Sequence, residues 1–185
     1  MSSSNPENII IATMRLVESN ENSNIRINAN GGNSILLICN PINELDYVKA
    51  IKKLMTKDKY EIIDLNNLLC EFVSKNKSDL ENSFELLKGS LYQIFKIPDG
   101  EEGNDLLGLI LCAIDSSLKV NKIPVLINTG SLYGSRIGSI NIMENDLVMK
   151  AALPLIILYP ATREQDKIMF LGKRPASKYR CMIVD

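Results

Sequence analysis

The chain has 185 residues, of which 45% are hydrophobic and 23% are charged, and these proportions are typical of one soluble folded domain. Its 21 basic and 22 acidic residues give a formal net charge of −1, so no general attraction to nucleic acid or to an anionic membrane is expected. The sequence has no histidine, which excludes a Ser-His-Asp triad, a Cys-His protease pair and an HExxH zinc site.

The cysteines lie in or beside apolar runs and form no CxxC pair: Cys39, Cys70, Cys112 and Cys181. We expect small buried side chains here, and neither metal nor redox use is predicted. No secretory signal is recognised, because the apolar run at 9–12 is short and no basic region precedes it. The later apolar runs are also too short for a membrane span, so a cytoplasmic protein is predicted.

The N-terminal part of the chain predicts a helix and then a loop. The Asn-Pro-Glu run that starts at Asn5 resembles a helix cap, a first-turn proline and a first-turn acid, which predicts a helix over about 6–18. Residues 19–33 are rich in Asn and contain two adjacent glycines, so a loop is expected, with room for a short strand at 25–27.

A strand–helix–strand unit is predicted next. The continuous apolar run at 34–39 is typical of a strand covered on both faces, and 60–65 is interpreted as a second strand. Between them, apolar residues recur at helical spacing and should form one buried face: Leu45, Val48, Ile51, Leu54 and Met55. A unit of this length should place its two strands parallel, with a right-handed crossover.

The middle of the chain, about 67–119, predicts a helical insertion. One helix is expected over 67–74 and a second over 79–95, with Asp79 as its cap. The segment 106–118 is apolar almost all round, which predicts a helix buried on every side.

The next elements predict the second half of the sheet. A third strand is expected at 122–128, followed by a Gly/Ser loop at 129–139 and a helix at 140–152. The fourth strand, at 154–159, is expected to end at Pro160.

The end of the chain predicts a closing hairpin. After a polar turn at 161–167, strands at 168–171 and 179–184 are expected to pair, joined by a basic linker at 173–178. Together the elements predict a single α/β domain over 1–185, with a mostly parallel sheet of four to six strands flanked by helices. The topology expected is like that of P-loop NTPases, without a functional P-loop.

The loop after the first strand is where a P-loop would lie. It reads Asn-Pro-Ile-Asn-Glu over 40–44, with no GxxxxGK[ST] pattern, no lysine to reach a phosphate and no glycine. Pro41 also removes one amide donor. A working P-loop is therefore excluded, and Asn43 and Glu44 are interpreted as a helix cap and a first-turn acid.

The Gly-rich loop at 130–138 is the best candidate for a binding site, because it follows the carboxyl end of a predicted strand. Its glycines could expose backbone amides and Arg136 could pair with a carboxylate or phosphate; a flexible turn with a solvated arginine is the alternative.

The basic stretch at 167–180 could contact nucleic acid or an acidic protein surface, or form a solvated hairpin. No acid/base pair or metal ligand is assigned to Glu44, Asp64 or Asp166.

Several segments, taken in order, are similar to one known family. They are the strand, proline turn and acid of 35–44, the strand at 62–65, the Gly-rich turn with its aromatic and arginine at 125–136, the apolar strand closed by Tyr-Pro at 154–160, and the end of the chain at 170–172 and 179–184. In these segments the chain resembles the BrxB-like proteins of BREX bacteriophage-defence systems.

The resemblance implies a cytoplasmic, non-enzymatic accessory or adaptor protein that binds the PglZ alkaline-phosphatase-like protein. It allows the BREX ATPase and methyltransferase as further partners. It implies no catalytic residue, no cofactor and no metal. A degenerate nucleotide-binding, ATPase-like regulatory domain is the alternative, and direct DNA binding is the weakest of the three hypotheses. The candidate partner interface consists of Tyr133, Arg136, Tyr159, Lys173, Arg174, Tyr179 and Arg180.

Overall fold

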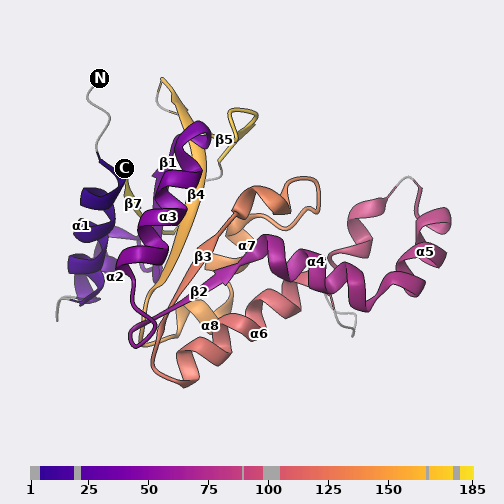
Figure 1. Cartoon of the computed structure of the whole chain (residues 1–185), viewed down its shortest axis with the longest axis horizontal. Coiled ribbons are helices and arrows are strands. Elements are labelled where there is room, and N and C mark those ends of the chain that lie inside the picture. The colour runs from indigo at the N-terminus through magenta and orange to yellow at the C-terminus, as the bar shows by residue number, and fades with distance from the viewer. Residues whose placement is uncertain (1–4, 19–21, 89, 98–104, 166, 177–179) are drawn as a thin grey trace.

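The computed structural model describes residues 5–18, 22–88, 90–97, 105–165, 167–176 and 180–185. These residues form an α/β fold in which helices flank a mostly parallel sheet (Figure 1). The predicted fold class is confirmed, although the sheet has seven strands where four to six were expected. No helix in the described ranges is both long and apolar enough to cross a membrane.

The parallel part of the sheet follows the order β2-β3-β4-β1-β7. Its strands are β1 (Ser34–Cys39), β2 (Tyr60–Asp64), β3 (Ile123–Ile127), β4 (Leu155–Glu164) and β7 (Met182–Val184). β1 lies between β4 and β7 and is buried at every residue, because both of its faces are covered. In this order β1, the strand before the loop where a P-loop would lie, is inside the sheet and not at its edge.

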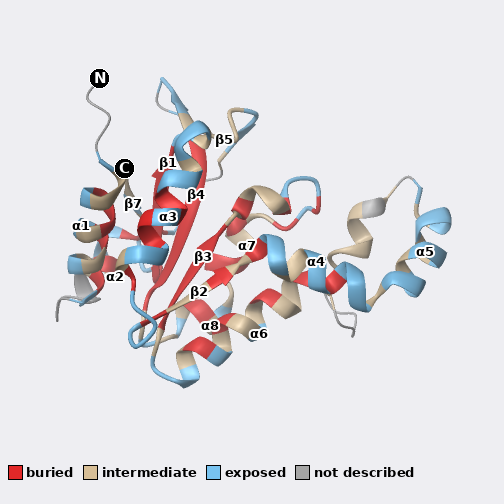
Figure 2. Cartoon of the chain, in the orientation of Figure 1, coloured by how far each residue is buried: buried red, intermediate tan, exposed pale blue. Residues whose placement is uncertain are grey.

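The side chains of β1 alternate between two hydrophobic layers, as the period of a strand requires. Ile35 and Leu37 pack in the layer formed with α1 (Pro6–Glu18) and α3 (Glu44–Leu54). Leu36 and Ile38 pack in the opposite layer, which includes residues of α4 (Leu65–Lys75), α6 (Leu106–Lys119), α7 (Ser139–Met143) and α8 (Asp146–Met149). Figure 2 shows that burial is concentrated on these central strands and on the helix faces turned toward them.

The predicted ending of the sheet is wrong in its strand pairing. β4 continues past Pro160 to Glu164 and pairs there with β5 (Lys167–Phe170) in antiparallel fashion, and β5 in turn pairs with β6 (Arg174–Pro175). β7 pairs with β1 at the other edge of the sheet, so 168–171 and 179–184 do not form a hairpin. Pro160 is tolerated because it lies where β4 changes partner, and its carbonyl accepts from the Leu171 amide at 2.9 Å.

The N-terminal predictions are confirmed in part. The helix over 6–18 is α1, and the Asn5 side chain accepts a hydrogen bond from the Glu7 amide at 3.0 Å, as expected of a cap. The segment 25–27 lies in a helix, α2 (Asn22–Asn28), and not in a strand. Leu45, predicted on the buried face of α3, is 63% exposed.

The helical insertion differs from the prediction in its second part. The expected helix at 79–95 is divided into α5 (Lys77–Leu86) and a 3₁₀ turn, η2 (Leu91–Ile94), and Asp79 lies inside the first turn rather than at the cap. α5 extends away from the sheet and buries none of its residues (Figures 1 and 2). α6 occupies the expected place but is buried along one stripe only: Leu106, Ile110, Ile114 and Ser117.

The predicted helix at 140–152 is also two helices, α7 and α8. Asn145 separates them, because its side chain accepts from the Leu147 amide at 3.0 Å and so begins a new helix.

Two of the four cysteines are buried as expected, and burial raises the pKa of Cys39 to about 12 and that of Cys181 to about 11. Cys70 and Cys112 are exposed, which corrects the prediction for that pair.

Candidate functional site

The turn after β1 is occupied by protein groups where a P-loop would hold phosphate. Asn40 Oδ1 accepts from the Ile42 amide at 3.0 Å and starts a 3₁₀ turn, η1 (Pro41–Asn43), that leads directly into α3. Glu44 begins α3, and its Oε1 is buried without a hydrogen-bond partner among the described residues. A phosphate would therefore meet an unpaired carboxylate at this helix start. Asn43 occupies the N-cap position of α3 and Glu44 lies in its first turn, as predicted, but the Asn43 side chain makes no capping hydrogen bond.

Replacement of Glu44 by Gln should stabilise the protein at neutral pH. Burial raises the pKa of Glu44 above its ordinary value of 4.5. At a pH above the raised pKa the buried carboxylate is ionised and lowers the free energy of unfolding, and at a pH below 4.5 this penalty is absent. We expect thermal unfolding of Glu44→Gln roughly 2 °C or more above wild type at pH 7, with the two proteins converging near pH 4. Asp46→Asn, at an exposed position on the same helix turn, is the control, and a lower midpoint for Glu44→Gln at pH 7 would contradict the prediction.

The acid at the end of β2 has a structural role. Asp64 Oδ1 caps α4 by accepting from the amides of Asn66 and Asn67, and it also accepts from Asn128 Nδ2 at 2.8 Å. Asn128, which follows β3, adopts a left-handed conformation with φ of 58°. In P-loop NTPases an aspartate of the Walker B strand holds Mg²⁺. Here the two strand ends are joined to each other, and no group of three or more potential metal ligands occurs in the described ranges.

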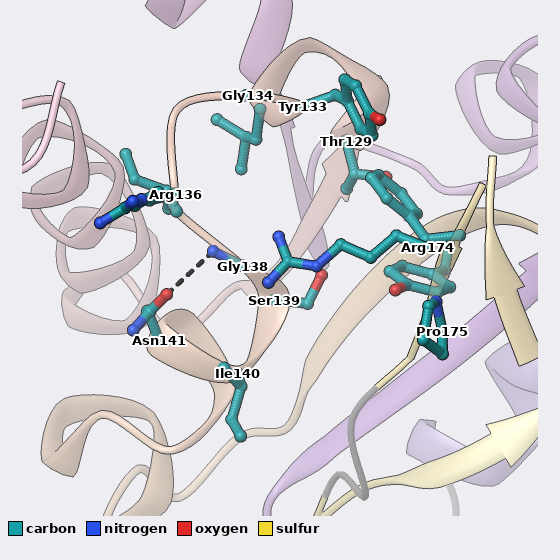
Figure 3. A pocket seen from close by; sticks show the side chains of 14 residues that line it. Thr129, Tyr133, Gly134, Arg136, Gly138, Ser139, Ile140, Asn141, Arg174 and Pro175 are labelled. Atoms are coloured by element: carbon teal, nitrogen blue, oxygen red, sulfur yellow. Dashed lines mark hydrogen bonds between the residues drawn. The ribbon is translucent and has the colours of Figure 1, made fainter. Parts of the chain in front are cut away.

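The Gly-rich loop is held by its own side chains. It begins with a 3₁₀ turn, η3 (Thr129–Leu132), and the Ser135 hydroxyl then donates to the Leu132 carbonyl at 2.7 Å and accepts from the Ile137 amide at 3.1 Å. The Gly138 amide donates to Asn141 Oδ1 at 2.8 Å (Figure 3). The expectation that glycines expose their amides is therefore wrong for Gly138, and the loop is pinned rather than free.

Arg136 joins this loop to the helical insertion. Its guanidinium carbon lies 3.4 Å from the centroid of the Tyr92 ring in η2, a cation–π contact. Its backbone is left-handed, with φ of 59°, which costs about 1–2 kcal/mol for a residue that is not glycine. The side chain remains on the surface, so Arg136 is exposed and anchored at the same time.

A cavity of about 100 Å³ lies between the Gly-rich loop, the end of the main sheet and the β5–β6 hairpin. The rings of Tyr159 and Phe170 form part of its wall and stack at a centroid distance of 4.7 Å. Arg174 extends from β6 across the cavity toward Ser139 (Figure 3). The lining residues include two arginines and no Asp, Glu, Lys or Cys, so the cavity is suited to binding an anion, and the Ser, Thr and Tyr hydroxyls in its lining have no carboxylate or lysine among the lining residues to activate them.

The structure brings together four of the seven predicted interface residues: Tyr133, Arg136, Tyr159 and Arg174. Lys173 precedes Arg174 but does not line the cavity. Arg180 belongs to the other edge of the sheet, where its carbonyl lies against Gly32, and Tyr179 is outside the described residues. Phe170 and Tyr92 are additions that sequence patterns missed, because their contacts depend on the β4–β5 register and on the fold of the insertion.

No protein-family model, curated protein or solved structure matches this chain. Membership of the BrxB-like family therefore stays a prediction from the segments described above.

Proposed function

We propose that the chain is a non-enzymatic adaptor that binds another protein through the surface around the Arg136 and Arg174 cavity. The observation that carries this proposal is the composition of the cavity lining: two arginines and stacked aromatic rings, at an end of the sheet where α/β proteins bind ligands, with no carboxylate, lysine or cysteine among the lining residues. Arginine and tyrosine are also the residue types enriched at the energetic centres of protein interfaces.

The partner we propose is the PglZ-like protein of a BREX-type phage-defence complex in the cytoplasm, with the BREX ATPase and methyltransferase as further contacts. This part rests on the family resemblance of the sequence. The net charge of −1 gives no support to direct binding of nucleic acid.

A degenerate nucleotide-binding domain is the second candidate, and the strand order β2-β3-β4-β1-β7 favours it. Two observations oppose it. Glu44 and the proline-containing turn occupy the place of a P-loop. The cavity, at about 100 Å³, is also smaller than the 300–1,000 Å³ typical of sites for cofactor-sized ligands.

The proposal predicts that Tyr133→Ala weakens partner binding without unfolding the protein. Tyr133 lines the cavity and is 57% exposed, so its loss should cost about 1–4 kcal/mol of binding if it lies in the interface, and should leave thermal stability nearly unchanged. The measurement is co-purification of the full chain with the PglZ-like protein of the same gene neighbourhood, followed by calorimetric titration.

Phe84→Ala is the matched control, because Phe84 is an aromatic residue of similar exposure, 53%, on the distant helix α5. Equal losses of affinity in the two variants would place the partner elsewhere. The same calorimeter tests the second candidate: micromolar, magnesium-dependent binding of ATP to the isolated chain would favour a nucleotide-binding domain over the adaptor.

A further inference from the structure

We infer that the cavity recognises a carboxylate of an acidic segment of the partner protein, with Arg174 as the recognising group. The inference rests on the proposed function and specifies the chemical group of the partner that the interface recognises. The backbone around Arg174 is fixed by the hairpin, because the Lys173 amide donates to the Phe170 carbonyl at 2.9 Å and the Ala176 amide donates to the Ile168 carbonyl at 2.7 Å.

The guanidinium of Arg174 has no acceptor among the described residues, whereas two other arginines do. Arg26 donates to the carbonyls of Met149 and Ala151, and Arg163 pairs with Asp185. In Figure 3 the Arg174 side chain crosses the cavity with its donor groups toward Ser139, while Arg136 points away from it. A planar guanidinium presents its N–H groups as a fork that fits the two oxygens of a carboxylate.

Arg136 adds a second positive charge at the rim. Stacking on Tyr92 holds the guanidinium by its face and leaves the in-plane N–H groups for hydrogen bonds. With two arginines and no acidic residue among the lining residues, the site is locally cationic in a chain whose net charge is −1. Such a site attracts an acidic segment and disfavours a basic one.

The geometry favours a carboxylate over a phosphate. Phosphate sites on α/β proteins use several free backbone amides of a loop, and here four amides of the loop that lines the cavity bond within the protein. The amides of Tyr133 and Ser135 donate to the carbonyls of Gly130 and Leu132, that of Ile137 to a serine hydroxyl, and that of Gly138 to Asn141. The volume of about 100 Å³ accommodates the end of a Glu or Asp side chain, with the stacked wall of Tyr159 and Phe170 beside its methylene groups.

The test is a titration of the ¹⁵N-labelled full chain, followed by NMR, with two blocked hexapeptides that differ only in two central residues, Glu-Glu or Gln-Gln. We expect the Glu peptide to shift the amides of 133–141 and the Arg174 side-chain Nε–H, and the Gln peptide to leave them unchanged. Arg174→Ala should weaken binding of the Glu peptide by about tenfold or more, as expected for loss of a hydrogen bond between charged groups.

Lys173→Ala is the matched control, because it removes one positive charge from the adjacent exposed residue, which does not line the cavity. It should change the affinity by less than about twofold, since an exposed charge beside the site contributes little. Thermal unfolding of both variants checks that the fold is intact.

Three results would overturn the inference: equal binding of the Gln peptide, equal losses for Arg174→Ala and Lys173→Ala, or inorganic phosphate displacing the Glu peptide at lower concentration than acetate does. The co-purification assay is read separately. If the wild-type chain captures the PglZ-like protein but does not bind the Glu peptide, the carboxylate site is overturned and the proposed adaptor function is unaffected. Selective binding of the Glu peptide without capture of the PglZ-like protein would support the carboxylate site and overturn that partner.

Discussion

Gly32→Ala should cost about 3 kcal/mol of unfolding free energy, at the upper end of what overpacking costs. A Cβ atom at Gly32 would lie 1.8 Å from the Arg180 carbonyl oxygen and 2.6 Å from its carbonyl carbon. These are backbone atoms, so no side-chain rotation relieves the collision, and the segment that leads into β7 has to move. We therefore expect β7 to lose its pairing with β1 in this variant, which urea unfolding and hydrogen exchange of the β7 amides would detect.

Gly31→Ala is the control for this experiment, because the adjacent glycine has open space around it and a left-handed φ of 85°. Alanine there carries only the backbone strain, about 1 kcal/mol. If the two variants unfolded at the same urea concentration, the close approach of Gly32 to Arg180 would not exist in solution.

Asn33→Asp should also be strongly destabilising, by roughly 3 kcal/mol or more at neutral pH, because it buries a charge that the Arg26 guanidinium, which donates to the same Ala151 carbonyl, offsets only in part. Asn33 is 3% exposed, and its Nδ2 donates to the carbonyls of Val148, Ala151 and Leu153 at 3.2, 2.9 and 2.9 Å. The aspartate variant keeps the shape but turns a carboxylate oxygen toward these carbonyl oxygens. Asn33→Ala should cost less, about 1–3 kcal/mol, because it removes the donor without adding a charge.

The pH dependence of stability separates the effect of the buried charge in Asn33→Asp from the effect of the lost hydrogen-bond donor, which both variants share. An aspartate in this place would have a raised pKa in the folded state, so its penalty is full above that pKa and falls as the pH is lowered toward the ordinary value. The difference between the Asp and Ala variants in urea unfolding should therefore shrink on acidification. Asn43→Asp, at an exposed position before α3, should be neutral or slightly stabilising, and a comparable loss there would contradict the explanation.

Local patterns of the sequence predicted the elements whose boundaries are set locally. α1 is recognisable from its capping asparagine and first-turn proline, and β1 from six consecutive residues without a charge. The break between α7 and α8 was missed, although the polar run at 144–146 contains an Asn followed by an acid, which is a signal for the start of a new helix. Pro160 was taken as a strand end, since the change of partner that makes a proline tolerable there depends on β1 and β5 together.

The candidate site was predictable only as far as residue type and loop position allow. The glycines and Arg136 mark a loop after a strand, and the structure places Arg174 at the same cavity. The stacking of Tyr159 on Phe170 follows from the antiparallel turn of β4 onto β5, and the Tyr92 contact follows from the position of η2. Both are long-range consequences of packing, which short sequence patterns do not contain.

The position of β1 in the sheet has a consequence for folding kinetics. Its register with β4 joins residues roughly 120 positions apart, so the central pairing forms only after a long loop closes, and a high contact order slows folding. Until then β1 is an uncharged, apolar segment with both edges unpaired, the kind of segment that associates with other chains. β1, which is buried on both faces in the native sheet, is therefore also a segment prone to aggregation in folding intermediates.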